Sequence, residues 1–510
     1  MLSELQKFHK RGVTMAKNLV YDIHDKPKFG NLLIFALQQV LAILAATIAV
    51  PAIIGLPTQM PAAIFGAGVG TLIYQLFTKF KSPVFLGSSF AFISSLFVAL
   101  AYGYCGIVLG SVVAGLVYVV IAIVIKIVGT EWVGKLMPPV IIGPTVAVIG
   151  LSLAGNAMGD MVKSNAIAAP ALPAHEIVGT PIASYNLIAL LCGLITFFTV
   201  VICSTQKRRQ MPRLIPFIIG IATGYAAASV FTVIGNVAGI EYFKIINWQP
   251  VIDNFVNADG AFKGVEAFFK VPTFAIVEAI KELVTGTSSL EGAAYLIYTQ
   301  DIQGSVANIV AVVVAFLPVA LVVFAEHIAD HKNLSSIIDR DLIKDPGLDR
   351  TLLGDGVGSI GGTLFGICPN TTYGESVGCV AITGNASVIT ITTAAIMCLI
   401  LSFFSPLMVI LQTIPSCVMG GVCLTLYGFI AVSGLKMIKD VDLNENKNLF
   451  VVSAILIAGI GGLAIQIPYA FGTEGGATVV NAAIQVTSVA TALILGIITN
   501  AVLSKIEKKK

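Results

Sequence analysis

The sequence contains the run Pro369-Asn370-Thr371-Thr372-Tyr373-Gly374-Glu375-Ser376-Val377-Gly378, which places a carboxylate inside one of the most apolar parts of the chain. An unpaired charge at the depth of a lipid bilayer costs at least a few kcal/mol, so Glu375 is a candidate functional residue. Pro369, Gly374 and Gly378 break any continuous helix, and irregular backbone at that depth is tolerated only inside protein or along a cavity. The run therefore predicts an interrupted membrane segment whose polar middle faces a binding site.

Composition places the chain among polytopic membrane proteins. Of its 510 residues, 56% are hydrophobic and 11% are charged, whereas soluble domains average about 25% charged residues. The first thirty residues are polar and basic, which predicts a cytoplasmic N-terminus and no cleavable signal peptide. The eight cysteines show no metal-site grouping, so we interpret them as reduced apolar fillers and expect neither metal nor cofactor. The basic residues lie in loops and at the ends, so the net charge of +3 does not indicate nucleic-acid binding.

Apolar runs of roughly 20 residues predict about fourteen spans in an all-α polytopic membrane protein. Two of them, the third and the tenth, are short and interrupted by Gly, Ser or Thr. The expected spans are 31–50, 62–78, 84–100, 105–128, 138–157, 186–204, 214–236, 306–329, 351–367, 371–384, 387–409, 416–434, 449–466 and 482–504.

Loop charge supports this topology, because Lys and Arg in short loops favour the cytoplasmic side. With the N-terminus inside, 25 of the 30 Lys and Arg residues fall on the cytoplasmic side. The other five lie in two long external loops, which this rule constrains weakly. One of these loops, 237–305, has amphipathic pieces at Phe262–Phe269 and Phe274–Leu283. We interpret it as an external cap, with partner binding as the alternative.

The two halves of the chain resemble each other. Span five opens with Pro138 and Gly143, and span twelve opens with Pro415 and Gly420, so each has Pro, four residues and then Gly. The broken segments three and ten are also seven spans apart, and an odd offset inverts the second half relative to the first. Short broken segments at matching positions of inverted repeats point to a binding site near the middle of the membrane.

Four acidic residues fall inside the expected spans: Glu326, Asp330, Asp355 and Glu375. Glu326 and Asp330 are four residues apart and share one helix face, whereas His327 and His331 point elsewhere. The alternative to a functional role is a structural anchor bonded to backbone donors, which we prefer for Asp355 because it lies between two glycines.

Several motifs resemble those of the nucleobase/ascorbate transporter family, and especially its bacterial uracil permeases. The most specific is Pro-Asn-Thr-Thr-Tyr-Gly followed by Glu-x-x-Gly-x-x-x-x-Thr-Gly, from Pro369 to Gly384. The others are Ala325-Glu326-His327, Gly87-Ser88-Ser89-Phe90-Ala91-Phe92 and Asp345-Pro346-Gly347-Leu348. The resemblance covers roughly residues 30–505 apart from the 237–305 loop.

The resemblance implies a secondary active transporter, not an enzyme, that imports a nucleobase by proton symport as a homodimer in the bacterial inner membrane, in contact with lipid. It also implies a core domain that moves against a gate domain. The expected divisions are a cytoplasmic segment 1–30, core 31–128 and 306–409, gate 138–236 and 416–504, the external insertion 237–305 and a basic cytoplasmic tail 505–510.

Uracil presents two ring N–H donors and two carbonyl acceptors, so its site needs acceptors and donors in one plane. We expect Glu326 and Glu375 to accept from the N–H groups, and backbone N–H groups near Phe90 and Gly374 to donate to the carbonyls. Phe90 would cover a ring face, or would simply pack in the core. Tyr373 is a further substrate-binding candidate. Buried polar groups left unpaired by a wrong ligand give strong rejection.

Three departures from the family pattern leave the exact nucleobase and the proton path open. Asp330 stands where the similar uracil permeases have His, and purine-carrying members more often have Asp there. Ser376 replaces a usual Asn, and Gln38-Gln39 replaces Gln-His. We therefore expect Asp330 and Glu326 to couple protons, with Na⁺ binding or a backbone hydrogen bond as alternatives for Asp330. Gln38, Ser376 and Tyr427 are lining or gating candidates.

Three functional classes remain at this point. The first is a nucleobase symporter, with uracil ahead of xanthine or another purine. The second is an inorganic-anion exchanger of the same general fold, which two carboxylates at the site would disfavour by repulsion. The third is a membrane enzyme, which the scattered histidines and cysteines do not support, because they form no nucleophile–base or metal constellation.

The charge pattern predicts that the loop holding Arg208 faces the cytoplasm and that the 237–305 loop faces outside. In a cysteine-free background, Val265→Cys should react with a membrane-impermeant thiol reagent added to intact cells, and Arg208→Cys should react only after permeabilisation. The reverse labelling would contradict the fourteen-span topology with a cytoplasmic N-terminus.

Overall fold

The computed structural model describes residues 19–163, 185–206, 212–213, 215–290, 302–439, 441–474 and 477–507. This part of the chain is mostly helical, and nine of its helices are long and apolar enough to cross a membrane. The expectation of a helical, polytopic membrane protein is thus confirmed, while the fourteen spans and the inverted repeat stay predictions. Arg208, the first eighteen residues and the last three lie outside the described residues.

The helices pack in two groups. In the first, α14 and α15 pack on α5, while α3 packs on α15 and α17. Its helices are α2 (Phe29–Ile53), α3 (Met60–Phe77), α4 (Ile93–Leu100), α5 (Gly103–Val128), α14 (Ile302–Ile338), α15 (Leu348–Phe365), α16 (Gly374–Thr383) and α17 (Val388–Leu401).

In the second group, α19 packs on α7 and α9, and α20 packs on α7 and α21. Its helices are α7 (Pro139–Ser152), α8 (Ala154–Met161), α9 (Leu187–Ser204), α11 (Pro216–Ala238), α19 (Ser416–Ile438), α20 (Asn446–Ile460) and α21 (Ser488–Glu507). Helices α2 and α14 of the first group contact α7, α11 and α19 of the second. Short helices α6 (Glu131–Leu136) and α18 (Ser405–Gln412) lie on the connections between the groups.

Glycines bring α3 and α15 into backbone contact. A Cβ on Gly70 would lie 2.8 Å from the carbonyl oxygen of Gly358, and a Cβ on Gly358 would lie 2.7 Å from that of Gly70. Gly66 meets Gly362 in the same way, one turn along both helices. Helices without a hydrophobic driving force between them associate through such small residues, because close approach maximises packing contacts.

Two short strands replace helix where the sequence predicts interrupted segments. Strand β1 (Leu86–Ser88) pairs antiparallel with β2 (Asn370–Thr372), with Gly87 opposite Thr371. The pairing satisfies backbone N–H and C=O groups that no helix satisfies here, which the membrane interior requires. Each strand then leads into a short helix: β1 through the 3₁₀ turn Phe90–Phe92 into α4, and β2 into α16.

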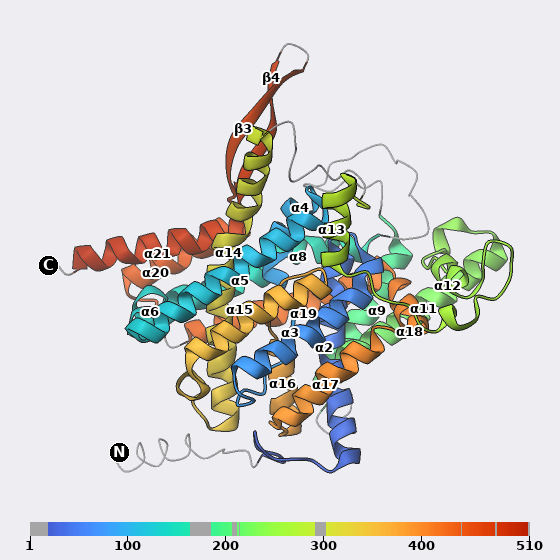
Figure 1. Cartoon of the computed structure of the whole chain (residues 1–510), viewed down its shortest axis with the longest axis horizontal. Coiled ribbons are helices and arrows are strands. Elements are labelled where there is room, and N and C mark those ends of the chain that lie inside the picture. Colours follow the sequence, from blue (N-terminus) through green and yellow to red (C-terminus); the bar gives the residue numbers. More distant parts are fainter. Residues whose placement is uncertain are drawn as a thin grey trace.

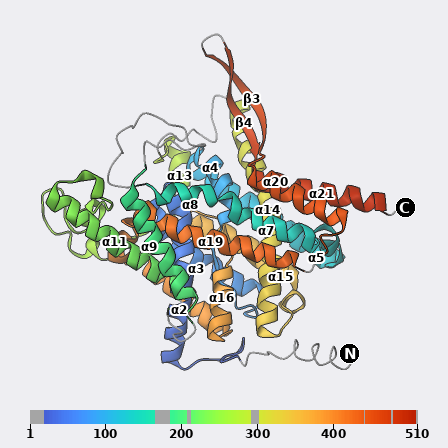
Figure 2. The same ribbon diagram turned by 180° about the vertical axis from the view of Figure 1, so that it is seen from behind.

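The structure corrects two of the expected spans. The span expected at 387–409 is two helices, because α17 ends at Leu401 and Pro406 stands in the first turn of a new helix, α18. The last span begins later than 482, since β3 (Ile465–Glu474) and β4 (Ala477–Val486) form an antiparallel hairpin before α21. The β-branched residues of this segment are common in strands and are also apolar, so hydropathy alone does not distinguish a strand from a membrane helix here. Figures 1 and 2 show this hairpin projecting beyond the helices.

The described part of the 237–305 insertion packs on both groups of helices, since its 3₁₀ turn Glu241–Phe243 contacts α11 and a later helix contacts α5 and α15. The expected amphipathic piece at 274–283 is helix α13 (Ala275–Thr285), whereas 262–269 holds the 3₁₀ turn Gly264–Ala267 between isolated β-bridges at Phe262 and Phe269. Glu282 of α13 accepts hydrogen bonds from the backbone N–H groups of Tyr104 (2.9 Å) and Cys105 (2.8 Å) at the start of α5. The other helix of the insertion, α12 (Gln249–Phe255), packs on α18. The external position of this insertion stays a prediction.

The α3–α15 contact predicts that a single methyl group at Gly358 is costly. Gly358→Ala would push against the Gly70 carbonyl and the Leu86 side chain, so we expect it to destabilise the protein by about 1–3 kcal/mol. Gly428→Ala is the matched control, because it also lies in a long helix and a Cβ there would meet nothing within 4 Å. Thermal unfolding of both variants in detergent checks this; equal unfolding temperatures would contradict it.

Candidate functional site

A cavity of about 550 Å³ lies between the two groups of helices. One wall comes from the first group and holds six of the nine expected site residues: Phe90, Glu326, Asp330, Tyr373, Gly374 and Glu375. The opposite wall comes from α7, α11 and α19 and is largely apolar, with Val146, Phe217, Phe429 and Ile430. Arg213 and Lys436 also line the cavity, and both are exposed.

Helix α14 presents its two carboxylates to this cavity. Glu326 and Asp330 are one turn apart, as expected from their spacing. The Oδ2 atom of Asp330 accepts a hydrogen bond of 2.6 Å from the hydroxyl of Thr372, at the end of β2. The Oε2 atom of Glu326 is buried and has no hydrogen-bond partner in the described part of the chain. A buried carboxylate oxygen without a donor is costly, so Glu326 is an acceptor that a ligand N–H would satisfy.

The third carboxylate stands at the start of α16. Glu375 lies in the first turn of this helix, directly after Tyr373 and Gly374. The first backbone N–H groups of any α-helix lack partners within the helix, so this end offers donors as well as a positive partial charge. Tyr373 holds the end in place, because its backbone N–H donates to the Phe85 carbonyl (3.1 Å) and its hydroxyl donates to the Ser88 carbonyl (2.9 Å). The site therefore combines acceptors from α14 with donors from α16.

An aromatic contact joins the two groups of helices beside the cavity. The rings of Phe90 and Tyr427 meet edge to face, with their centroids 5.5 Å apart. Phe90 lines the cavity, whereas Tyr427 is buried behind it and is not among the lining residues. Tyr427, expected as a lining or gating residue, thus contacts a cavity residue from the opposite side.

The two remaining expected residues, Gln38 and Ser376, lie outside the cavity wall. Both are buried, and neither is among the lining residues. Ser376 accepts a hydrogen bond from the side chain of Gln39, which ties α16 to α2. Gln38 and Ser376 are therefore buried residues outside the cavity lining.

Sequence reasoning missed part of the site and the partner of one residue. Phe217, Phe429 and Ile430 gave no signal, because apolar residues in apolar helices look alike whichever surface they face. Thr372 had no predicted role, although a hydroxyl two residues before Gly374 indicates a possible hydrogen-bond donor near the carboxylates, and it donates to Asp330. Asp355 bonds the ring of His327 (2.7 Å) and not backbone donors. Among the described residues, no group of three or more His, Cys, Asp or Glu side chains is arranged to hold a metal ion.

Comparison with known proteins finds relatives over most of the chain. A family model described as "Permease family" matches residues 30–468. The chain is 34% identical to a uracil permease of Bacillus subtilis over 97% of both chains, and 34% identical to a uracil permease of Bacillus caldolyticus over 95% of this chain and 94% of that one. It is 32% identical to the uracil permease of Escherichia coli K12, covering 87% of this chain and 88% of that one.

Two solved structures share the fold at low sequence identity. The transmembrane domain of the cyanobacterial bicarbonate transporter BicA is 14% identical, with a TM-score of 0.53 over 86% of this chain and 99% of that one. The murine anion transporter Slc26a9, in its inward-facing state, is 11% identical, with a TM-score of 0.57 over 95% of this chain and 69% of that one. These likenesses concern the fold alone. The family match and the permease relatives confirm the resemblance drawn from the motifs, and the chain belongs to the nucleobase/ascorbate transporter family of membrane permeases.

Proposed function

We propose that this protein is a secondary active transporter that imports uracil together with protons. The observation that carries the proposal is the pairing of Glu326 and Glu375 in one cavity with the N-terminus of α16. This set of acceptors and donors suits a neutral ring that carries both N–H and C=O groups. The relatives named as uracil permeases, aligned over nearly the whole chain, support the same substrate.

The ring would lie between the carboxylates and the broken segments. Glu326 offers its unpaired Oε2 to one N–H of the base, and Glu375 offers an acceptor to the other. Backbone N–H groups at Gly374 and Phe90 would donate to the carbonyls, while the Phe90 ring covers one face. A site that hydrogen-bonds its ligand in this way rejects analogues lacking those groups, because its buried polar atoms would then be left unpaired.

Xanthine is the second candidate substrate, and Asp330 is the observation that favours it. Purine-carrying members of the family more often have Asp at this position, and the cavity of about 550 Å³ leaves room for a bicyclic base. Uptake of labelled uracil into proteoliposomes, competed by xanthine and by uric acid with and without a pH gradient, decides between them. If uptake of labelled uracil does not saturate as the uracil concentration rises, the uracil assignment is contradicted.

We extend the proposal to fourteen spans in two inverted sevens, with the first group of helices as the core domain and the second as the gate domain. The short segments β1–α4 and β2–α16 would be spans three and ten. The cavity reaches Arg213 and Lys436, which the charge pattern assigns to the cytoplasm, so this conformation would open inward. Contact between Phe90 and Tyr427 would close the outer side. The proposed setting is a homodimer in a bacterial inner membrane, with both termini cytoplasmic.

Asp330 is the proposed site of proton coupling. It lies one turn from Glu326 in the same cavity, and two carboxylates that close cannot both ionise cheaply. Thr372 donates to one oxygen of Asp330, which leaves the other free to carry a proton. A nucleobase that needs ionised Glu326 as acceptor would then favour a proton on Asp330, so loading of substrate and proton would be linked.

Removing one charged acceptor should weaken binding of uracil. A hydrogen bond to a charged group contributes roughly 1.5–3 kcal/mol, so Glu326→Gln and Glu375→Gln should each weaken uracil affinity by about ten- to a hundredfold. Equilibrium binding to purified, monodisperse protein measures this. Unchanged affinity in both variants would place the substrate site elsewhere.

Asp330→Asn should separate transport from coupling. The amide mimics a permanently protonated carboxyl, so the variant should still exchange uracil across the membrane yet fail to accumulate it against a gradient. Counterflow and pH-driven uptake in the same proteoliposomes measure the two properties. Full pH-driven uptake by Asp330→Asn would show that Glu326, Glu375 or another group carries the coupling proton.

A further inference from the structure

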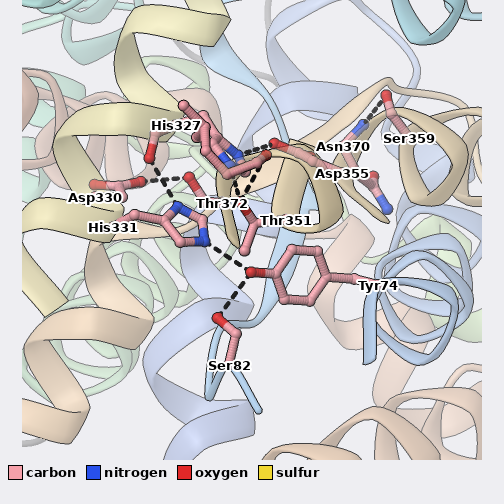
Figure 3. A network of polar contacts seen from close by, with 11 residues as sticks. Tyr74, Ser82, His327, Asp330, His331, Thr351, Asp355, Ser359, Asn370 and Thr372 are labelled. Atoms are coloured by element: carbon pink, nitrogen blue, oxygen red, sulfur yellow. Dashed lines mark hydrogen bonds and ion pairs between the residues drawn. The ribbon is translucent and has the colours of Figure 1, made fainter. Parts of the chain in front are cut away.

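A second polar cluster lies behind the candidate site, on the other side of α14. His327, the neighbour of Glu326, places Nδ1 2.7 Å from Oδ2 of Asp355 and Nε2 3.1 Å from the hydroxyl of Thr351 (Figure 3). The side chains of His327 and Asp355 are fully buried, and neither lines the cavity. A buried pair of ionisable groups that substrate cannot reach calls for a physical explanation.

The neighbouring His331 is held in one protonation state by its hydrogen bonds. Its Nδ1 lies 2.8 Å from the backbone oxygen of His327, which only accepts, so Nδ1 carries the hydrogen. Its Nε2 then accepts from the Tyr74 hydroxyl (2.7 Å), which in turn accepts from Ser82 (2.8 Å). A further proton would create a buried cation with no carboxylate bonded to it, which is strongly unfavourable. His331 is therefore a neutral structural residue.

His327 differs because its hydrogen-bond partners allow the His327–Asp355 pair to hold either one or two protons. The Thr351 hydroxyl has a choice of acceptors, His327 Nε2 and the Leu348 carbonyl at 3.2 Å. If it donates to Nε2, then Nδ1–H donates to the Asp355 carboxylate, and the pair holds one proton with a charge of −1. If it turns to Leu348, then Nε2–H donates to Thr351 and a second proton lies between Nδ1 and Oδ2, so the pair is neutral. Only a hydroxyl rotates between the two states.

Among the described residues, no cation is bonded to this pair to fix the charged state. Around His327 lie the ring of His331, at 4.0 Å between centroids, and the ring of Tyr118 from α5, at 6.4 Å, while Glu326 and Asp330 occupy the adjacent, cavity-facing side of its own helix. The Oδ1 atom of Asp355 is buried without a hydrogen-bond partner in the described structure. Such an oxygen is tolerated far better in a neutral carboxylic acid than in a carboxylate, so gain of a proton relieves a cost.

We propose that His327 and Asp355 form a second proton-binding site of the transporter, outside the substrate cavity. This inference rests on the proposed proton symport and adds a residue pair to it. Asp355 is within electrostatic range of Glu326, so a negative pair makes ionised Glu326 more costly. Protonation of the pair therefore favours the ionised Glu326 that accepts from the nucleobase. Uracil affinity accordingly rises as pH falls through the range in which the pair titrates.

The test compares uracil affinity at about pH 6 and about pH 8.5, a range centred near the ordinary titration of histidine. Wild-type protein should bind roughly tenfold more tightly at the lower pH, a typical coupling between two sites. Asp355→Asn mimics the neutral pair, so in an Asp330→Asn background, which removes the other proposed proton site, its affinity should change less than about twofold over this range, whereas Asp330→Asn alone should keep a clear pH dependence. Tyr74→Phe is the matched control. It disturbs the adjacent His331 network, which has a single protonation state, and should keep the wild-type ratio of uracil affinities at the two pH values.

Two outcomes overturn the proposal in this experiment. The double variant Asp330→Asn, Asp355→Asn with the same ratio as Asp330→Asn alone would show that the pair does not titrate with binding. Loss of the ratio in both this double variant and Tyr74→Phe would show a general disturbance of packing.

A second measurement needs neither uracil nor a variant of the pair. In the triple variant Glu326→Gln, Asp330→Asn, Glu375→Gln, infrared difference spectra between the same two pH values should retain the band of a buried carboxylic acid. Disappearance of every such band would overturn the proposal. Because no substrate is present, a failure of uracil transport and a failure of the proton site are told apart.

Discussion

The pairing of β1 with β2 is the constraint on which the rest of the structure depends. Two chain segments give up helical hydrogen bonds deep in a helical membrane protein, and each satisfies the other across only three residue pairs. The pairing needs room beside α3 and α15, which their glycines provide, because a Cβ on Gly70 or Gly362 would collide with the Asn370 side chain of β2. It also fixes where α16 begins, so the N-terminal end of this helix and Glu375 face the cavity.

Helix α14 connects the chemistry on the two sides of this pairing. One face turns Glu326 and Asp330 toward the cavity, and the next face turns His327 and His331 into the packed interior against α15 and α3. Asp330 is bonded to Thr372 of β2, so the helix and the strand pair hold each other in register. Glu326 on the cavity face and Asp355, the partner of His327 on the other, are close enough to interact electrostatically.

Much of the site was predictable from the sequence because its signals are local. Glu375 beside Gly and Pro in an apolar run, and Glu326 with Asp330 at helical spacing, are recognisable as candidate site residues within a few positions, and all three line the cavity. The hairpin at 465–486, the opposite wall of Phe217 and Phe429, and the bond between His327 and Asp355 were not predictable in this way. Each depends on which distant segments meet, and neither hydropathy nor spacing within one element records that. His327 was predicted correctly to face away from the cavity, but its bond to Asp355 was not predicted.

The fold itself does not choose the substrate. A bicarbonate transporter and an anion transporter share this architecture, so the site must make the distinction. Three carboxylates line the cavity here, and Arg213 and Lys436, its exposed cations, are not bonded to them in the described structure. An anion entering this cavity would lose its water and meet like charge, which costs several kcal/mol. A neutral ring with N–H groups meets the same carboxylates as hydrogen-bond acceptors. The residues that would exclude an anion are thus the ones that would hold a nucleobase, and a single set of charges determines both.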